Sequence, residues 1–176
     1  MKGIRTWMMA AVAAVLFVSP GLLLAVKGPK PLAEQVRHEL VMLPYYGVFD
    51  NLMFKVNGDT VTLMGDVTRP ILKSDAENVV RRIPGVKSVD SQINVLPLSS
   101  FDDHIRMREL RAIYGNSVLS RYGWGTQPSI RIIVNRGDVR LEGTVMNEAD
   151  RNIAGLMANG VSGVFSVTNN LVVKKS

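Results

Sequence analysis

The residue types that most often perform catalysis or bind metals are few in this chain and are not clustered. Its only histidines are His38 and His104. Neither has a second histidine or a carboxylate at the spacing that a zinc site requires, so we expect both on solvated helix surfaces. The absence of cysteine excludes disulfides, thiolate metal sites and a cysteine nucleophile.

The patterns of nucleotide-binding proteins and hydrolases are also missing. Gly123-Trp124-Gly125 indicates a turn, because its surroundings do not match a phosphate-binding loop. The scattered Ser, His and Asp residues lack a nucleophile-elbow pattern. The formal net charge of +6 comes without a dense run of Lys and Arg, which argues against nucleic-acid binding. The sequence therefore predicts no catalytic residue, no metal site, no cofactor and no nucleic-acid partner.

The N-terminal part of the chain has the pattern of an export segment. Lys2 and Arg5 precede an apolar run over residues 7–18, and Ser19-Pro20-Gly21 then breaks it. This order is typical of a signal peptide, although residues 7–26 would also be long enough for a retained membrane anchor. We predict a signal peptide or anchor over 1–26, a linker over 27–30, and a periplasmic or inner-membrane-tethered protein facing the periplasm.

The rest of the chain contains an internal repeat, in which Val56 corresponds to Val134. Shifting the sequence by this offset gives twelve identities over the 42 positions 54–95, without gaps. The matched residues are mainly apolar residues and glycines, on which a fold depends most. Among them, Gly65 aligns with Gly143, and Gly85 aligns with Gly163. A fixed offset of this kind indicates one structural unit present twice.

Each copy follows the order α-β-β-α-β. In the first copy, apolar residues every four positions over 31–43 predict a helix, and alternation over 52–56 and 61–67 predicts two strands. A second helix over about 71–83 and a strand over 86–95 follow. We predict an α+β protein with modules at 31–97 and 98–176, each a three-stranded mixed sheet with two helices on one face. Gly65 and Gly143 should mark a bulge or a close backbone approach.

These motifs resemble a known family. Val61-Thr-Leu-Met-Gly-Asp-Val67 and Gly85-Val-Lys-Ser-Val-Asp-Ser-Gln-Ile-Asn-Val95, with a helix between them, resemble the BON domain of bacterial envelope proteins. The second copy, with Val139–Val145 and Gly163–Val173, resembles it equally well. The similarity covers nearly everything after residue 30. One departure is that the family's Asn before the third strand is present at Asn169-Asn170, whereas the first copy has Asp90-Ser91.

The resemblance implies a non-enzymatic module, often found in tandem, in periplasmic and outer-membrane proteins. Such proteins are associated with osmotic stress, envelope integrity and binding to phospholipid surfaces. The lipid-anchoring cysteine of lipoprotein members is absent here. We therefore expect binding to an anionic phospholipid surface. The alternative is a chaperone-like or protein-interaction module that holds another envelope protein.

The first helix of the second copy is the candidate site. If helical periodicity continues to residue 119, then Met107, Leu110, Tyr114 and Val118 form its core face. A second stripe then lies on nearly the opposite side, and with its neighbours it gives a predicted membrane or partner face of Ile105, Arg108, Ala112, Leu119, Tyr122 and Trp124.

Two interpretations of this face remain open. The stripe could pack against the first copy, because each copy is small on its own and gains stability from a shared buried surface. It could instead rest on an anionic membrane, where aromatic and basic residues are favourable. A second aromatic cluster, Tyr45-Tyr46-Gly47-Val48-Phe49, is predicted to connect a helix to a strand over the core, or else to form a partner site.

Overall fold

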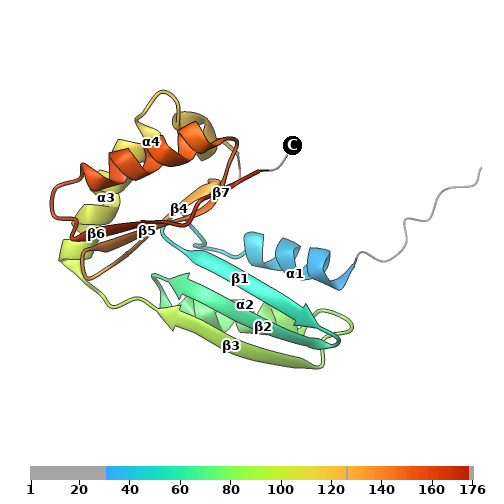
Figure 1. The fold of residues 1–176 in the computed structure, drawn as a ribbon. Helices are drawn as coiled ribbons and strands as arrows, with labels where there is room; N and C mark the ends of the chain where they lie inside the picture. Colours follow the sequence, from blue (N-terminus) through green and yellow to red (C-terminus); the bar gives the residue numbers. More distant parts are fainter. Residues whose placement is uncertain (1–30, 126, 175–176) are drawn as a thin grey trace, which may run out of the picture.

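The computed structural model describes residues 31–125 and 127–174, so the predicted export segment and linker lie outside the described residues (Figure 1). The first module contains α1 (Leu32–Val41), β1 (Asn51–Asn57), β2 (Thr60–Val67), α2 (Pro70–Arg81) and β3 (Ser88–Val95). The second contains α3 (Ser100–Tyr114), the 3₁₀ helix η1 (Ser120–Gly123), β4 (Ile130–Asn135), β5 (Asp138–Val145), α4 (Glu148–Asn159), β6 (Ser166–Asn169) and β7 (Val172–Val173). Among these residues, no helix has the length and apolar character needed to span a membrane.

The strand pairing confirms the internal repeat. In the first module β1 pairs with β2 antiparallel and β3 pairs with β2 parallel. Val56 lies opposite Val61, and the corresponding residues of the second copy, Val134 and Val139, are paired in the same way in β4 and β5. The predicted α+β architecture of two tandem modules with mixed sheets is therefore confirmed.

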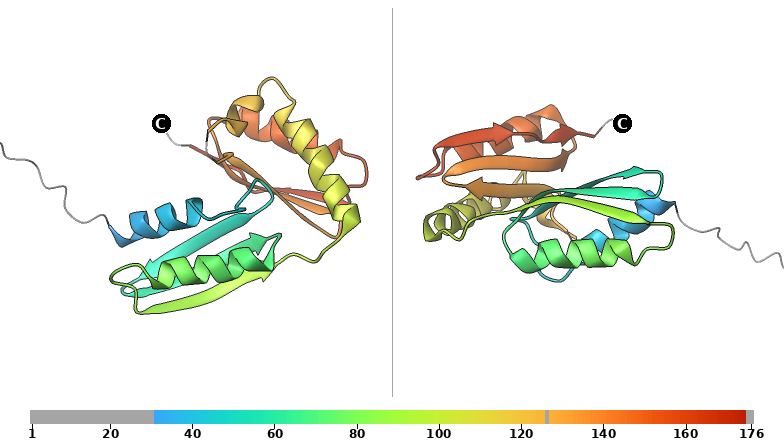
Figure 2. Two further views of the ribbon diagram at one scale, coloured as in Figure 1. Left: turned by 180° about the vertical axis from the view of Figure 1, so that it is seen from behind. Right: turned by 90° about the horizontal axis from the view of Figure 1, so that it is seen from below.

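The helices of each module cover one face of its sheet and close a separate core (Figure 2). In the first module α1 and α2 bury a stripe of apolar side chains at helical spacing against alternate residues of β2. The fully or almost fully buried members are Val36, Leu40, Leu72, Ala76, Val80, Val61, Leu63 and Val67. The second core lies under α3 and α4 in the same arrangement.

The last strand of the second module departs from the predicted single strand. It is divided into β6 and β7, which both pair parallel with β5. The interruption is at Asn169, whose side chain accepts a hydrogen bond from the N–H of Leu171 and donates one to the carbonyl of Arg151. The Asn169 side chain thus bonds locally at the interruption, while the N–H of Asn170 still donates to the carbonyl of Leu141 on β5 at 2.9 Å.

The strand glycines mark close backbone approaches, as predicted. Gly65 has φ +117° and Gly143 has φ +119°. A Cβ atom at Gly65 would overlap the carbonyl oxygen of Asn51, and at Gly143 it would overlap that of Ser129. Neither overlap can be relieved by rotating a side chain, because the obstructing atoms belong to the backbone. Gly85 and Gly163, which follow α2 and α4, also have positive φ.

Replacing Gly65 with Ala should destabilise the protein by more than about 2 kcal/mol, since it adds a backbone clash to an unfavourable φ. Gly58→Ala is the matched control: Gly58 also has positive φ, but nothing lies within 4 Å of its added Cβ. It should cost about 1–2 kcal/mol. Urea denaturation followed by circular dichroism measures both, and equal losses would contradict the close-approach explanation.

The connection between α1 and β1 joins the two modules. Asp50, which is buried, accepts hydrogen bonds from the N–H of Gly47 and of Thr68 and so fixes this loop. Val48 and Phe49 then pack against the core of the second module. The predicted connecting role of the aromatic cluster is confirmed, and part of the cluster covers the second module's core as well as the first's.

A set of polar contacts holds the second sheet against this loop. The Arg131 guanidinium donates to the carbonyl of Gly47 at 2.7 Å and lies 4.5 Å from the ring centroid of Tyr46. The N–H of Ile132, on β4, donates to the carbonyl of Val48 at 2.9 Å. The α1–β1 loop therefore covers both the outer face and the edge of β4.

The inter-module contact continues across the sheets. Arg140 on β5 forms an ion pair with Asp66 on β2. Ile133 and Leu96, both buried, line one small cavity of about 150 Å³ beside this pair. The second module thus contributes the open face of its sheet. The first module contributes the α1–β1 loop, the end of β2 and the residue after β3.

Candidate functional site

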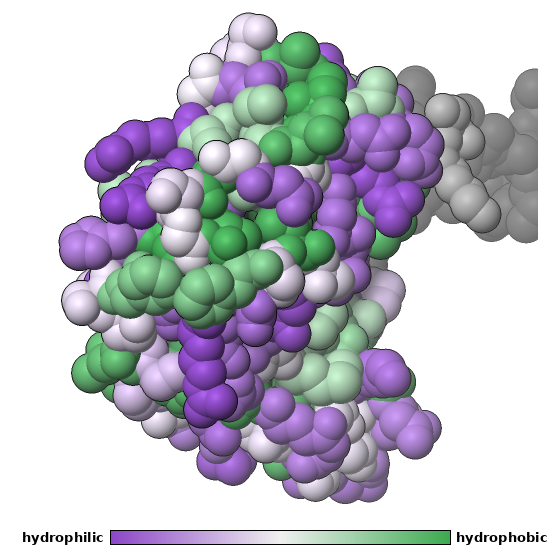
Figure 3. Space-filling view, turned by 60° about the vertical axis from the view of Figure 1, so that its left-hand side comes forward, coloured by the Kyte–Doolittle hydropathy of each residue, from purple (hydrophilic) through white to green (hydrophobic). Residues whose placement is uncertain are grey.

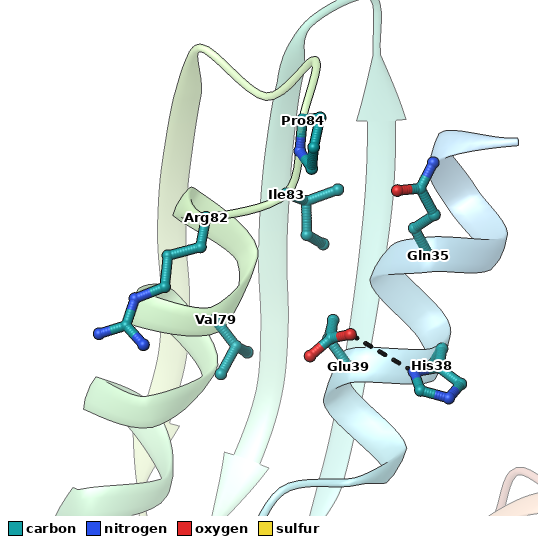
Figure 4. Close-up of a pocket in the computed structure, with 7 residues that line it drawn as sticks. All are labelled: Gln35, His38, Glu39, Val79, Arg82, Ile83 and Pro84. Carbon is teal, nitrogen blue, oxygen red and sulfur yellow. Dashed lines mark hydrogen bonds and ion pairs between the residues drawn. The ribbon is translucent and has the colours of Figure 1, made fainter. Parts of the chain in front are cut away.

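A groove of about 440 Å³ lies between α1 and α2 (Figure 4). His38, which is exposed, and Glu39, which is half-buried, lie on its α1 side, and their side chains are 3.4 Å apart. Val79, Ile83 and Pro84 supply apolar surface on the other side. The second histidine, His104, is exposed on α3. Within the described residues, no group of three or more His, Cys, Asp or Glu side chains is placed to hold a metal.

Helix α3 buries a face that differs from the predicted one. Its buried residues are Asp102, Ile105, Arg106, Glu109 and Ile113. Ile105 belongs to the second module's own core, whereas Met107, predicted for the core, is 43% exposed. Leu110 and Tyr114 pack against this core, as predicted, but the prediction was wrong for Met107 and Val118, which are exposed, because charged residues occupy much of the buried stripe.

Leu119 and Tyr122 are also buried in this core, so they cannot form a membrane or partner face. The prediction failed because α3 ends at Tyr114, and the helical projection does not extend to Leu119. The alternative that the stripe packs against the first module is also wrong for Ile105 and Leu119, which lie in the second core. Ala112 is half-buried, and only Arg108 and Trp124 of the predicted face are exposed.

Two of the three buried charged residues on α3 have polar partners. Asp102 accepts hydrogen bonds from the N–H groups of Arg136 and Gly137, so it ties the start of α3 to the β4–β5 turn. Arg106 donates to Asp103 and to the carbonyl of Val134. These bonds offset the cost of burying charge and fix α3 on the sheet.

Glu109 differs, because neither of its carboxylate oxygens has a hydrogen-bond partner and its side chain is fully buried. Burial alone raises the pKa of Glu109 from 4.5 to about 8. The carboxyl is therefore largely protonated at neutral pH in the folded protein, whereas in the unfolded chain it is ionised.

This difference predicts a pH-dependent stability. Between pH 4.5 and about 8 the folded state holds a proton that the unfolded state has lost, so the free energy of unfolding falls as the pH rises. The slope contributed by Glu109 is about 1.4 kcal/mol per pH unit. Glu109→Gln should remove this slope and stabilise the protein more at pH 7.5 than at pH 5.

Urea denaturation at a series of pH values measures the effect. Glu148→Gln is the matched control, since the Glu148 side chain is 65% exposed and should leave the slope unchanged. A Glu109→Gln variant with the wild-type pH dependence would contradict the unpartnered, protonated state.

The outward side of α3 combines basic and apolar side chains. His104, Arg108 and Arg111 are exposed and follow one another at spacings of four and three, which places them on one side of the helix. Phe101 and Met107, on the same helix, are also exposed. We call these five residues the α3 outer face.

A second aromatic residue extends this face. Phe165, 74% exposed, lies next to Phe101 with ring centroids 5.8 Å apart. Arg108 donates to the carbonyl of Ser162 at 2.9 Å, which links α3 to the segment that carries Phe165. Figure 3 shows this side of the molecule, where apolar surface gathers on the second module among hydrophilic side chains.

Trp124 lies at the other end of the second module. The hydroxyl of Tyr122, two residues before it, accepts a hydrogen bond from the N–H of Met146, just after β5. Tyr122 and Arg121 both bond to the buried Asp150 and hold this end rigid. Phe165 instead lies beside Gly137, just before β5. The structure therefore does not bring Arg108 and Trp124 together.

Arg111, Met107, Phe101 and Phe165 were missed from the sequence. The spacing of His104, Arg108 and Arg111 along the helix could have indicated Arg111. Phe165, by contrast, is 64 positions from Phe101, and no local pattern connects the two. Only the parallel pairing of β6 with β5 places Phe165 beside the start of α3.

The family comparison agrees with this architecture. The model of the BON domain matches residues 30–97 and 116–175, which together are most of the chain. The chain belongs to the BON-domain family. BON domains are membrane-associated modules, and proteins that contain them are generally non-catalytic. The two matches coincide with the two structural copies, although the second begins after α3.

Other comparisons give little more. No curated protein is significantly similar to the chain. Two solved structures of CdsD, a structural protein of the type III secretion system of Chlamydia trachomatis, are similar to it. One is 16% identical with a TM-score of 0.30, covering 82% of this chain and 93% of that one. The other, a C-terminal domain, is 14% identical with a TM-score of 0.31, covering 84% and 99%.

Proposed function

We propose that this BON-domain protein is a non-catalytic protein of the bacterial envelope that binds anionic phospholipid surfaces and supports the envelope under stress. Its place is the periplasm, or the periplasmic side of the inner membrane if the N-terminal segment is retained. The observation that carries the proposal is the α3 outer face, where exposed arginines lie beside an exposed aromatic pair.

The side chains suit the interface between lipid headgroups and water. Phe101 and Phe165 present adjoining rings that can enter the interfacial layer, while Arg108 and Arg111 reach phosphate groups. Each basic residue near an anionic surface contributes about 1 kcal/mol. The exposed acid of the helix, Asp103, is paired with Arg106, which reduces its repulsion of phosphates.

The scaffold beneath this surface is preorganised. Asp102 fixes α3 to the β4–β5 turn, and Arg108 fixes it to the α4–β6 connection. The basic and aromatic side chains therefore approach the membrane from elements whose positions are set before binding, which lowers the entropy lost on binding. Residues 98–176 carry ten basic and seven acidic residues, which gives this half a net charge of +3 that attracts anionic lipid.

Arg108→Glu should weaken binding to vesicles of mixed phosphatidylglycerol and phosphatidylcholine roughly tenfold or more, because it removes one attraction and adds one repulsion. Co-sedimentation with vesicles, at low and high salt, measures the bound fraction. Binding of the wild-type protein should require the anionic lipid and fade with salt.

Arg82→Glu provides the matched control, since it makes the same charge change at an exposed position of the first module. It should reduce binding much less than Arg108→Glu does. Equal losses would show that only net charge matters, and wild-type binding to neutral vesicles alone would contradict the basic face.

An apolar cleft beside the α3 outer face favours the second candidate function, the holding of an envelope protein. Phe49, Leu98 and Met107 line this cleft of about 330 Å³, and Leu98 is 96% exposed. A protein partner held there would depend on Leu98 more than on Arg108, and its binding would vary little with salt. Leu98→Ser separates the two functions, because lipid binding through α3 does not require Leu98.

A further inference from the structure

Strand β1 has an open edge in the first module. It pairs with β2 on one side, and no other described strand pairs with it. The N–H of Leu52 points to the open side, because it donates to the hydroxyl of Tyr46. Backbone groups alternate in direction along a strand, so those of Phe54 and Val56 also point outward. Within residues 31–125 and 127–174, neither of these two N–H groups has an acceptor on that side.

The same edge of the second module is covered. Phe54 lies opposite Leu63, and Ile132 lies opposite Leu141 in the same register, so Ile132 is the structural counterpart of Phe54. The N–H of Ile132 donates to the carbonyl of Val48 in the α1–β1 loop. A segment of backbone therefore already occupies, beside β4, the position that is open beside β1.

The apolar side chains at the two edges differ in burial. Three on β4 are fully buried, namely Ile130, Ile132 and Val134. Those at the same register of β1 are only half-buried, namely Leu52, Phe54 and Val56. The first module therefore keeps apolar surface at this edge that a bound segment would remove from water.

A groove of about 490 Å³ runs along the open edge. Ala33 and Arg37 of α1 line it, together with residues of β1, namely Leu52, Met53, Phe54 and Val56. Helix α1 lies beside β1 on the side away from β2 (Figure 1). A strand added to β1 would therefore meet unpaired backbone groups along one side and α1 on one face.

We propose that the open edge of β1 binds an extended segment of another protein, which pairs antiparallel with β1 and carries apolar side chains alternating with acidic ones. This function goes beyond membrane attachment, which uses the second module. A segment added to a sheet edge gains affinity from main-chain hydrogen bonds and specificity from its alternate side chains. Antiparallel pairing is the more stable arrangement per residue.

The groove selects the chemistry of the segment. Residues directly opposite each other in an antiparallel pair have side chains on the same face. Those opposite Phe54 and Val56 lie on the helix side, near Ala33, where apolar side chains are favourable. The residues between them lie beside Lys55, which is exposed on the other face. The Arg37 guanidinium, 6.0 Å from the ring centroid of Phe54, adds a second positive charge, so an acidic segment is complementary.

The position of α1 favours a single strand over a second copy of this chain. Two β1 strands paired antiparallel would be related by a two-fold axis perpendicular to the sheet. That axis keeps both helix layers on the same face, so the α1 helices of the two copies, each beside its own β1, would compete for the same space. A segment without a helix of its own avoids this conflict.

A capped peptide as long as β1, in which glutamate alternates with valine from end to end, is the probe. It is added to the purified, isotope-labelled protein and followed by nuclear magnetic resonance. The amide hydrogens of Phe54 and Val56 should exchange with water more slowly once the peptide is bound, because they then donate to its carbonyls. The other residues of β1 already face β2 and should change less.

Methylation of the peptide backbone tests the pairing itself. In the antiparallel arrangement the valine N–H groups face β1 and the glutamate N–H groups face away. A peptide methylated on its valine nitrogens should therefore not bind, whereas one methylated on its glutamate nitrogens should bind like the parent. The two peptides have the same charge, so equal binding by both would overturn the proposal, and so would the reverse order.

Charge reversal tests the recognition of acidic side chains. Lys55→Glu should weaken binding of the peptide roughly tenfold, because it places like charges opposite each other across the strands. Arg82→Glu is the matched control, since it reverses a charge at the exposed C-cap of α2, outside the groove lining, and should change binding little. Circular dichroism verifies that both variants are folded. Equal losses would contradict a site at β1.

The remaining outcomes also decide the proposal. A wild-type protein that does not bind the peptide at millimolar concentration would overturn it. Slow exchange at Phe54 and Val56 without peptide would show that another part of this chain already occupies the edge, or that a second copy does if the effect grows with protein concentration. Either result would also overturn it. None of these measurements involves lipid, so failure here leaves the membrane function standing.

Discussion

Strand β4 is buried on both faces, and the arrangement of the whole molecule depends on this double burial. Ile130, Ile132 and Val134 face the core under α3 and α4. Arg131 and Ile133 face the first module. A strand at the edge of a sheet normally leaves backbone groups unpaired, and here the carbonyl of Val48 accepts the N–H of Ile132. Two modules therefore share buried surface and form one unit, which suits domains that are each too small to bury a large core alone.

The same contact explains some of the differences between the two modules. Arg131 and Arg140 supply long side chains that reach Gly47 and Asp66, and the equivalent residues of the first module, Met53 and Thr62, do not need that reach. Core positions have changed less, because the pairing of Val56 with Val61 and of Val134 with Val139 serves one function in both copies. The sheet face that one copy uses and the other leaves open is therefore one place where the two copies differ for a structural reason.

The fold was largely predictable from the sequence, but the site was not. Period-two alternation and the internal repeat depend on spacing along the chain, so the strands, helices and module order followed from them. The buried face of α3 could not be predicted from spacing, because it includes the charged residues Asp102, Arg106 and Glu109. Asp102 and Arg106 are tolerated there through bonds to the β4–β5 turn and to Val134, which lie far from them in the sequence. A helical projection contains no such information.

Burying charge on one side of α3 has a consequence for its other side. Because Asp102 and Asp103 are engaged by the turn and by Arg106, the acids near the start of the helix are neutralised locally. The cations of the outward side, Arg108 and Arg111, are left as the main charges that an approaching surface meets. The surface at Trp124 lies at the far end of β5, which has a strand length of about 25 Å. Arg108 and Trp124, which the sequence predicts on one face, therefore lie in separate parts of the second module.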